Sequence, residues 1–294
     1  MKDAFSNIGN VVVGLIIAGF RDLSAPTVSF QGERGAYSEQ AATMFFGEAV
    51  VTKPCRTIKQ VFQSVEEKSV DYGIVPAENS LEGSINQTYD LLLETSLKIS
   101  GEVKVRVRHC LLSIPGTKIE ELRVVYSHPQ ALAQCAGYLE KLGVEAIAAY
   151  DTAGSAKLVN EKQLKAGAIA SERAAELYGL EVLRRNIEDF SENFTRFFVL
   201  ARTDAHPTGK DRTSILFATR HTPGSLHNVL GELASRRINL TKIESRPIRG
   251  TPWEYNFFVD FDGHEKDPTV SEAITALKNS TAMLKILGSY PRAD

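Results

Sequence analysis

One segment of the chain reads Glu192-Asn193-Phe194-Thr195-Arg196-Phe197-Phe198-Val199-Leu200. Its aromatic and β-branched residues, followed by an apolar end, are typical of a buried or half-buried β-strand. Because successive side chains of a strand point to opposite faces of the sheet, Thr195 and Arg196 are expected to serve different surroundings unless the strand bends between them. The plain structural interpretation is a sheet threonine beside an arginine that pairs with a nearby carboxylate.

Strand-like and helix-like pieces alternate along the chain before this segment. The expected strands are residues 27–30, 50–51, 72–75, 124–126, 146–150 and 166–170, and an extended region spans 99–114. The expected helices are residues 37–46, 58–67, 85–93, 131–142, 156–162 and 171–178. This alternation predicts mostly parallel sheets with helices on their faces.

Polar loops that open a helix recur where expected strands end. They contain Gly35-Ala36, Asn79-Ser80, Ser127-His128 and Thr152-Ala153. In open α/β sheets ligands bind beyond the carboxyl ends of the strands, and helix N-termini favour anions. Helix capping explains each loop on its own. Together with an arginine in a buried strand, the loops favour a carboxylate-rich ligand in a cleft between two lobes.

A shorter unit follows a polar linker at residues 204–212, which contains proline and glycine and marks a domain boundary. We expect strands at 213–219, 238–245, 254–260 and 283–289, with helices at 225–236 and 270–278. The order βαββαβ is the ferredoxin-like arrangement. Such a sheet has an exposed face and edge strands, which invite self-association.

The composition excludes several classes of function. The 294 residues are 43% hydrophobic and 24% charged with a formal net charge of -2, so neither nucleic acid nor an anionic membrane surface is an expected partner. The three cysteines, Cys55, Cys110 and Cys135, suit neither a disulfide framework nor a zinc site and indicate the cytoplasm. The six histidines lack metal-ligand spacing, so no metal is expected.

The first 26 residues are expected to be an N-terminal extension without function. The apolar run at residues 11–20 is too short to span a bilayer. Lys2 is followed at once by Asp3, and no small-residue cleavage pattern follows the run, so a secretory signal is not favoured.

The motifs together resemble those of a known family. Gly32-Glu33-Arg34-Gly35-Ala36-Tyr37-Ser38, Pro76-Ala77-Glu78-Asn79-Ser80-Leu81-Glu82-Gly83-Ser84, Ser127-His128-Pro129-Gln130 with Gln134, and Asn193-Phe194-Thr195-Arg196-Phe197 are similar to the motif series of prephenate dehydratase, in the same order. The C-terminal unit resembles the ACT regulatory domain of that family. Gly224-Ser225-Leu226 and Glu244-Ser245-Arg246-Pro247 stand where the family carries its phenylalanine-sensing motifs. The resemblance covers about residues 27–290.

The resemblance implies an enzyme that makes phenylpyruvate from prephenate, with loss of water and carbon dioxide, in phenylalanine biosynthesis, without cofactor or metal. It implies a catalytic domain at 27–204, built from two α/β lobes like those of type II periplasmic binding proteins. Lobe 1 is expected at about 27–103 plus 187–204 and lobe 2 at about 104–186. The ACT domain is expected at 212–294, with L-phenylalanine bound between subunits of a homodimer or homotetramer.

The resemblance also assigns roles to residues. Prephenate carries two carboxylates and a ring hydroxyl that must depart, so a donor aimed at that hydroxyl stabilises the transition state. By resemblance Thr195 is this donor, through hydrogen bonding more than proton transfer because its hydroxyl is a poor acid. The expected substrate-binding residues are Asn79, Ser80, Ser127, Gln134, Thr152 and Arg196. Arg196 suits a carboxylate through its bidentate fork, although a structural role stays open.

Other polar residues near these motifs are expected to be mainly structural. Glu78 and Glu82 are assigned to capping and lobe packing, because a carboxylate near a dianion is disfavoured, and His128 to a structural hydrogen bond more than to catalysis. The expected effector-binding residues are Gly224, Ser225, Leu226, Asn228, Glu244, Ser245, Arg246 and Pro247. The alternative there is a simple turn and a surface ion pair.

Two other functions stay open at this point. Arogenate dehydratase would keep the fold and the chemistry but act on the amino analogue, whose ammonium would need acceptors. A two-lobed binding protein without catalysis would need export and would leave the C-terminal unit unexplained. A fused chorismate mutase is not expected, because the residues before Thr27 are too few for its helical bundle.

Overall fold

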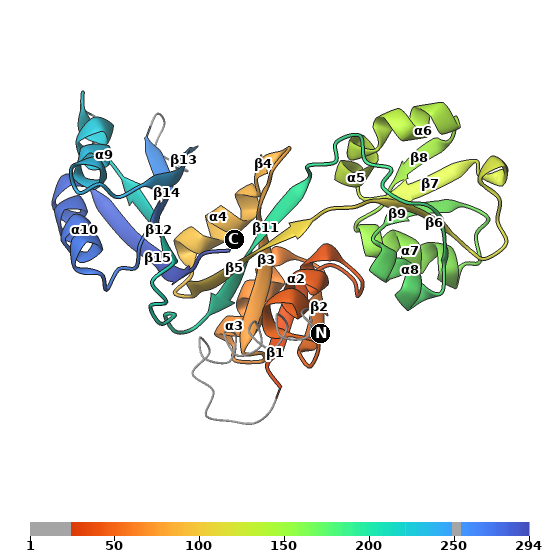
Figure 1. Ribbon diagram of the computed structural model, residues 1–294, viewed down its shortest axis with the longest axis horizontal. Coiled ribbons are helices and arrows are strands. Elements are labelled where there is room, and N and C mark those ends of the chain that lie inside the picture. Colours follow the sequence, from red (N-terminus) through yellow and green to blue (C-terminus); the bar gives the residue numbers. More distant parts are fainter. Residues whose placement is uncertain (1–24, 221, 249–253, 294) are drawn as a thin grey trace, which may run out of the picture.

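The computed structural model describes residues 25–220, 222–248 and 254–293. Most of the expected N-terminal extension, including its apolar run, lies outside these residues. The described chain forms three sheets. Figure 1 shows the three units in a row, with the first lobe between the second lobe and the C-terminal unit.

Lobe 1 is the unit around the central sheet. Its strands are β1 (Thr27–Gln31), β2 (Val51–Cys55), β3 (Tyr72–Asn79), β4 (Gly83–Ser84), β5 (Lys98–Arg106) and β11 (Phe194–Ala201). Their order is β2-β1-β3-β11-β5, and β4 pairs with β3. The helices are α2 (Tyr37–Phe46), α3 (Ile58–Glu66) and α4 (Asn86–Glu94). The segment 192–200 thus supplies β11, which lies between β3 and β5 and is antiparallel to both.

Lobe 2 is the unit inserted between β5 and β11. Its strands are β6 (Cys110–Ser113), β7 (Val124–Ser127), β8 (Glu145–Ala148), β9 (Gly167–Ala170) and β10 (Glu181–Arg184), in the order β10-β6-β9-β7-β8. Its helices are η1 (Ile119–Glu121), α5 (Pro129–Gln134), α6 (Ala136–Leu142), α7 (Thr152–Glu161) and α8 (Glu172–Tyr178). The chain therefore crosses between the lobes twice, once after β5 and once before β11.

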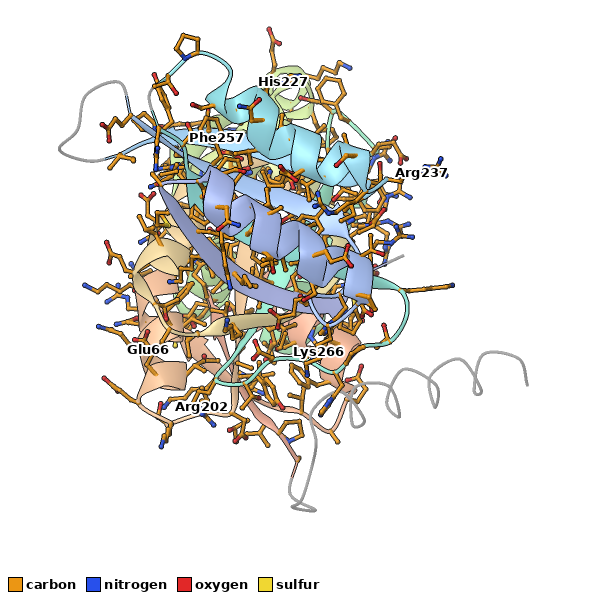
Figure 2. The ribbon with its side chains drawn as sticks, turned by 90° about the vertical axis from the view of Figure 1, so that its left-hand side faces the viewer. Glu66, Arg202, His227, Arg237, Phe257 and Lys266 are labelled. Atoms are coloured by element: carbon orange, nitrogen blue, oxygen red, sulfur yellow. The ribbon has the colours of Figure 1, made fainter. Side chains whose placement is uncertain are left out.

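The C-terminal unit has the expected βαββαβ order. It comprises β12 (Asp211–Ala218), α9 (Ser225–Ser235), β13 (Leu240–Pro247), β14 (Tyr255–Asp262), α10 (Pro268–Ser280) and β15 (Met283–Pro291). The strand order is β13-β14-β12-β15. Figure 2 shows α9 and α10 side by side over one face of this sheet. The fold class expected from the sequence, a two-lobed α/β region followed by a ferredoxin-like unit, is confirmed.

Lobe 1 packs against the face of the C-terminal sheet that the helices leave open. Leu216, Phe258 and Tyr290 of the C-terminal unit belong to the same buried cluster as Tyr89 and Phe198 of lobe 1. The approach is close, because a side chain at Gly288 would collide with the backbone carbonyl of Ile99. This face was expected to be available for self-association, and it is instead used within the chain.

Two local expectations were wrong, and one strand was missed. The strand β3 continues to Asn79, where the sequence predicted a polar loop, and a register shift opposite Arg196 and Phe197 accommodates Pro76. The helix expected at 131–142 is divided into α5 and α6 at Cys135, whose ψ of 17° lies outside the helical range. The short edge strand β10 was not predicted.

Candidate active site

A cavity of about 430 Å³ lies between the two lobes, and we call it the interlobe cavity. It is lined by Gln31, Ala36, Tyr37, Ser38, Arg56, Thr57, Ile58, Pro76, Asn79, Ile85, Gln87, His128, Gln130, Asp151, Thr152, Thr195 and Phe197. A smaller cavity of about 80 Å³, the inner cavity, shares Asn79, Thr152 and Thr195 with it and adds His109 and Gln134. The expected residues Asn79, Gln134, Thr152 and Thr195 are therefore brought together.

The starts of four helices line the interlobe cavity. These are α2, α3 and α4 of lobe 1 and α7 of lobe 2, each nine or ten residues long. No side chain caps α2 at Ala36 or α4 at Ile85, so N–H groups of their first turns are not taken by a cap. Helix N-termini carry partial positive charge and free donors. The cavity is therefore suited to an anionic ligand.

Within the described part of the chain, Asn79 holds the hydroxyl of Thr195. The Nδ2 of Asn79 donates to Thr195 Oγ1 at 3.1 Å. The orientation of the Asn79 amide is fixed because its Oδ1 accepts the backbone N–H groups of Leu81 at 3.0 Å and Glu82 at 3.2 Å. A hydroxyl that accepts this bond keeps its own proton for another acceptor. Thr195 can therefore donate into the cavity.

Two of the expected substrate-binding serines do not line either cavity. Ser127 is fully buried and donates to the carbonyl of Ile169 at 2.6 Å, which ties β7 to β9. Ser80 accepts the backbone N–H of Phe194 at 2.9 Å and donates to the carbonyl of Glu192 at 3.1 Å. Both hydroxyls are occupied by backbone groups, so we assign them to the shape of the site.

The structure places Arg196 away from the cavity, on the opposite face of β11. Its guanidinium contacts Glu102 at 2.7 Å and Asp260 of the C-terminal unit at 2.6 Å, and Glu78 lies 3.6 Å away. The pairing of β11 with β5 is regular through this region, so the strand does not bend between Thr195 and Arg196. The expectation that Arg196 binds substrate is therefore corrected in favour of the structural alternative.

Arg56 and Thr57 line the cavity and were not singled out from the sequence. They follow β2 directly and precede α3, so the rule that selected the loops after other strands would have found them. Thr57 caps α3 by accepting the N–H of Gln60. Among the described lining residues, Arg56 is the one permanent cation, and its guanidinium lies 5.9 Å from the ring centroid of Tyr150. It can attract a carboxylate to the mouth of the cavity.

The loop between β1 and α2 ties the lobes together beside the cavity. Glu33 of lobe 1 accepts from Tyr150 at 2.5 Å and from Lys157 at 3.1 Å, both in lobe 2. The Tyr150 hydrogen bond is the main reason why the pKa of Glu33 is lowered. Gly35, with φ of +86°, packs on Ala174 with no room for a side chain. The loop therefore holds the lobes at a fixed separation.

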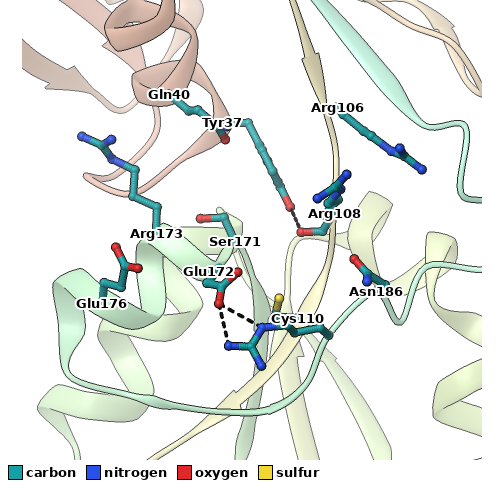
Figure 3. Close-up of a pocket in the computed structure, with 11 residues that line it drawn as sticks. Tyr37, Gln40, Arg106, Arg108, Cys110, Ser171, Glu172, Arg173, Glu176 and Asn186 are labelled. Carbon is teal, nitrogen blue, oxygen red and sulfur yellow. Dashed lines mark hydrogen bonds and ion pairs between the residues drawn. The ribbon is translucent and has the colours of Figure 1, made fainter. Parts of the chain in front are cut away.

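A third cavity, of about 410 Å³, is called the outer cavity, and it shares Tyr37 with the interlobe cavity (Figure 3). Arg106, Arg108, Arg173 and Arg185 contribute to its wall. Arg185 is neutralised by Glu172 at 2.6 Å, and the Tyr37 hydroxyl donates to the carbonyl of Arg108 at 2.5 Å. Arg106, Arg108 and Arg173 are exposed. None of the expected substrate residues lines this cavity.

The C-terminal cavity, of about 540 Å³, lies at the start of α9. It is lined by the expected residues Gly224, Ser225 and Leu226, and also by Thr222, His227 and Tyr255. Asn228, Glu244, Ser245, Arg246 and Pro247 do not line it. Two of them contact lobe 1 instead. Glu244 accepts a hydrogen bond from Ser84, and Arg246 pairs with Asp90 at 2.9 Å. The turn at Gly224, with φ of +82°, needs a residue that tolerates the left-handed region.

Among the described residues, no group of three or more histidine, cysteine, aspartate or glutamate side chains is arranged to hold a metal ion. No helix in the described part of the chain is long and apolar enough to cross a membrane.

The fold is that of a two-lobed α/β domain with a cavity between its lobes, joined to a small βαββαβ unit, and comparison with known proteins gives the family. The sequence model of prephenate dehydratase matches residues 28–205, and that of the ACT domain matches residues 213–279. The chain belongs to the prephenate dehydratase family.

Named relatives act on more than one substrate. The bifunctional chorismate mutase/prephenate dehydratase of Aquifex aeolicus is 46% identical over 268 residues, covering 90% of this chain and 74% of that protein. Arogenate dehydratase/prephenate dehydratase 2, chloroplastic, of Arabidopsis thaliana is 46% identical over 277 residues, covering 90% and 72%.

Two solved structures are similar over nearly their whole length. The prephenate dehydratase of Arthrobacter aurescens in complex with L-Phe gives a TM-score of 0.84 at 31% identity, covering 91% of this chain and 90% of that one. GqqA, described as a novel type of quorum quenching acylases, gives 0.83 at 38% identity, covering 91% and 98%.

Proposed function

We propose that this protein converts prephenate to phenylpyruvate by decarboxylating dehydration, in the biosynthesis of L-phenylalanine. The observation that carries the proposal is the Thr195 hydroxyl, which Asn79 holds with its proton free at the wall of an anion-suited cavity. Three free cysteines within the described chain suit a cytoplasmic enzyme.

The reaction places defined demands on such a site. The bond between the ring and its carboxylate breaks and releases carbon dioxide, and its electron pair completes the aromatic ring. The ring hydroxyl takes up a proton from solvent and departs as water. A hydrogen bond from Thr195 stabilises the charge that grows on this oxygen. The helix starts and Arg56 neutralise the two carboxylates.

The carboxylate that the described residues place in the wall of the interlobe cavity, Asp151, favours prephenate over arogenate. Asp151 accepts the backbone N–H of Gly154 at 2.7 Å as the cap of α7, and burial raises the pKa of its carboxyl. A capped carboxyl with a raised pKa offers less to an ammonium than a free carboxylate would. The kcat/KM for prephenate should therefore exceed that for arogenate. A preference for arogenate would keep the chemistry and overturn the substrate.

We further propose that L-phenylalanine binds the C-terminal unit and slows the reaction. The solved relative with bound L-Phe and the C-terminal cavity at Gly224 support this. The strand β13 lies at the edge of the sheet, and its Ile243 is 42% exposed. This edge suits a second copy of the chain, so a homodimer or a homotetramer is the proposed assembly.

Helix α4 offers a route from the C-terminal unit to the interlobe cavity. Its start, at Ile85 and Gln87, lines the cavity. Asp90 in its middle pairs with Arg246 at 2.9 Å, and Lys285 Nζ donates to the carbonyls of its last turn, including that of Leu92 at 2.9 Å. A displacement of β13 or β15 on effector binding would therefore move the start of α4. Such coupling requires two arrangements that the effector binds differently.

The Asp90→Asn protein should bind L-phenylalanine normally and be inhibited less by it. The substitution weakens the contact with Arg246 but leaves the interlobe cavity and the C-terminal cavity intact. Allosteric coupling typically changes affinity by roughly 5–150-fold, and part of the inhibition by phenylalanine should therefore disappear. Calorimetry would give the affinity, and initial rates at saturating phenylalanine would give the inhibition. Glu172→Gln, which breaks an exposed ion pair on lobe 2, is the control. Inhibition equal to that of wild type in Asp90→Asn would exclude this route.

A further inference from the structure

A continuous chain of amide side chains connects the two lobes behind Thr195. Asn193 is fully buried. Its Oδ1 accepts from Asn79 Nδ2 at 2.7 Å, and its Nδ2 donates to Gln134 Oε1 at 2.8 Å. Gln134 Nε2 in turn donates to Glu82 Oε1 at 3.0 Å. Asn193 thus joins Asn79 of lobe 1 to Gln134 of lobe 2, and it lines neither cavity.

The direction of every bond in this chain is determined by its two ends. At one end, the backbone N–H groups of Leu81 and Glu82 require an acceptor and so fix the Asn79 amide. At the other end, the Glu82 carboxylate requires a donor from Gln134. The Gln134 Oε1 therefore accepts, and His109 Nε2, 3.0 Å from it, carries the proton. Burial lowers the pKa of His109, in keeping with a neutral ring.

We propose that Asn193 is a positioning residue for the reaction. Through Asn79 it sets the direction of the Thr195 hydroxyl, and it does so only when Gln134 of lobe 2 is in place. This inference rests on the proposed function of the interlobe cavity. The Asn79 Nδ2 group has two protons and three acceptors nearby, namely Asn193 Oδ1 at 2.7 Å, Thr195 Oγ1 at 3.1 Å and the Phe194 carbonyl at 3.2 Å. Its placement therefore depends most on the Asn193 acceptor, which makes the shortest of these bonds. With Gln134 in place the chain is complete, and the Thr195 hydroxyl keeps its proton for the substrate.

Replacing Asn193 by aspartate exchanges the donor that faces Gln134 for an acceptor and changes little else. In Asn193→Asp the side chain keeps its shape and still accepts from Asn79. Its second oxygen then faces the Gln134 Oε1 acceptor, and two acceptors repel. Protonation of the new carboxyl restores a donor at that position, and a buried carboxyl has a raised pKa. The defect should therefore be repaired as the pH falls.

The experiment measures kcat and KM for Asn193→Asp and wild type between pH 5 and pH 9. We expect kcat of the variant to be lower by up to about 10²-fold at high pH, the cost of a misplaced catalytic group, with little change in KM. The ratio of variant to wild-type kcat should rise as the pH falls. The ionisable groups around the link are Glu82, His109 and Glu188, which accepts the backbone N–H of His109. Both proteins contain these groups, so the ratio of the two kcat values removes their titration.

Three controls separate positioning from stability. Asn160→Asp makes the same change on α7, and its ratio of variant to wild-type kcat should not change with pH. The double variant Asn193→Asp with Thr195→Ala should be no slower than Thr195→Ala alone, because the two residues act on one hydroxyl. If Asn193→Asp does not fold, Gln134→Glu places two acceptors at the next link, facing Glu82, and should show the same repair at low pH.

The outcomes distinguish the inference from the function on which it rests. The role of Asn193 would be overturned, and the function would stand, if the ratio of variant to wild-type kcat did not change with pH. Additive losses of kcat in the double variant would have the same meaning. Absence of turnover in the wild type would overturn the proposed function itself.

Discussion

The Thr195→Ala protein should bind prephenate with nearly normal KM and convert it about 10²–10³ times more slowly than wild type, the loss typical when one oriented donor is removed from a developing charge. The side chain is half-buried at the cavity wall, so removing its hydroxyl and methyl group changes packing little. Asn79 would lose one acceptor and keep Asn193 and the Phe194 carbonyl. Steady-state kinetics on the two purified proteins provide the measurement.

Thr195→Ser is the matched control, because it keeps the oxygen that accepts from Asn79. We expect it to retain appreciable activity, reduced by the freedom of its unbranched side chain to adopt other rotamers. Equal turnover by Thr195→Ala and wild type would remove Thr195 from the reaction.

Arg196→Met should lower the free energy of unfolding by about 3–5 kcal/mol, the cost of removing one partner from a buried ion pair. The carboxylate of Glu102 has no exposed surface and that of Asp260 is only 5% exposed. Arg212 would still contact Glu102 at 2.7 Å, whereas Asp260 would keep, among the described side chains, the hydroxyl of Ser214. Urea denaturation, followed for both the lobes and the C-terminal unit, would measure the change.

The double variant Arg196→Met with Asp260→Asn tests the cause of that loss. Neutralising Asp260 removes the uncompensated charge, so the double variant should regain part of the lost stability. If Arg196→Met were as stable as wild type, the ion pair between Arg196 and Asp260 would contribute nothing to holding lobe 1 and the C-terminal unit together.

The sequence predicted the parts of the site that depend on local rules. Alternation along a strand separates Thr195 from Arg196, and the structure shows this separation. The rule for loops after strands selected Asn79 and Thr152, both of which line the cavity. The βαββαβ order of the C-terminal unit also follows from local patterns.

The rest depends on contacts between residues far apart in the chain. Nothing in the segment 192–200 shows that Arg196 meets Asp260, because that contact arises from the docking of two sheets. Glu244 and Arg246 lie in a motif that suggested effector binding, yet docking turns them toward lobe 1. Ser127 has the residue type and position of a ligand donor, but the carbonyl of Ile169 takes its hydroxyl.

The measurement that tests the central claim most directly is the formation of phenylpyruvate from prephenate by the purified full-length chain, with and without L-phenylalanine. We expect phenylpyruvate to form without added metal or cofactor, and the rate to fall when phenylalanine is added. Formation of phenylalanine from arogenate at a higher kcat/KM would change the substrate and keep the site. Turnover of neither compound would contradict the assignment of the interlobe cavity as a dehydratase active site.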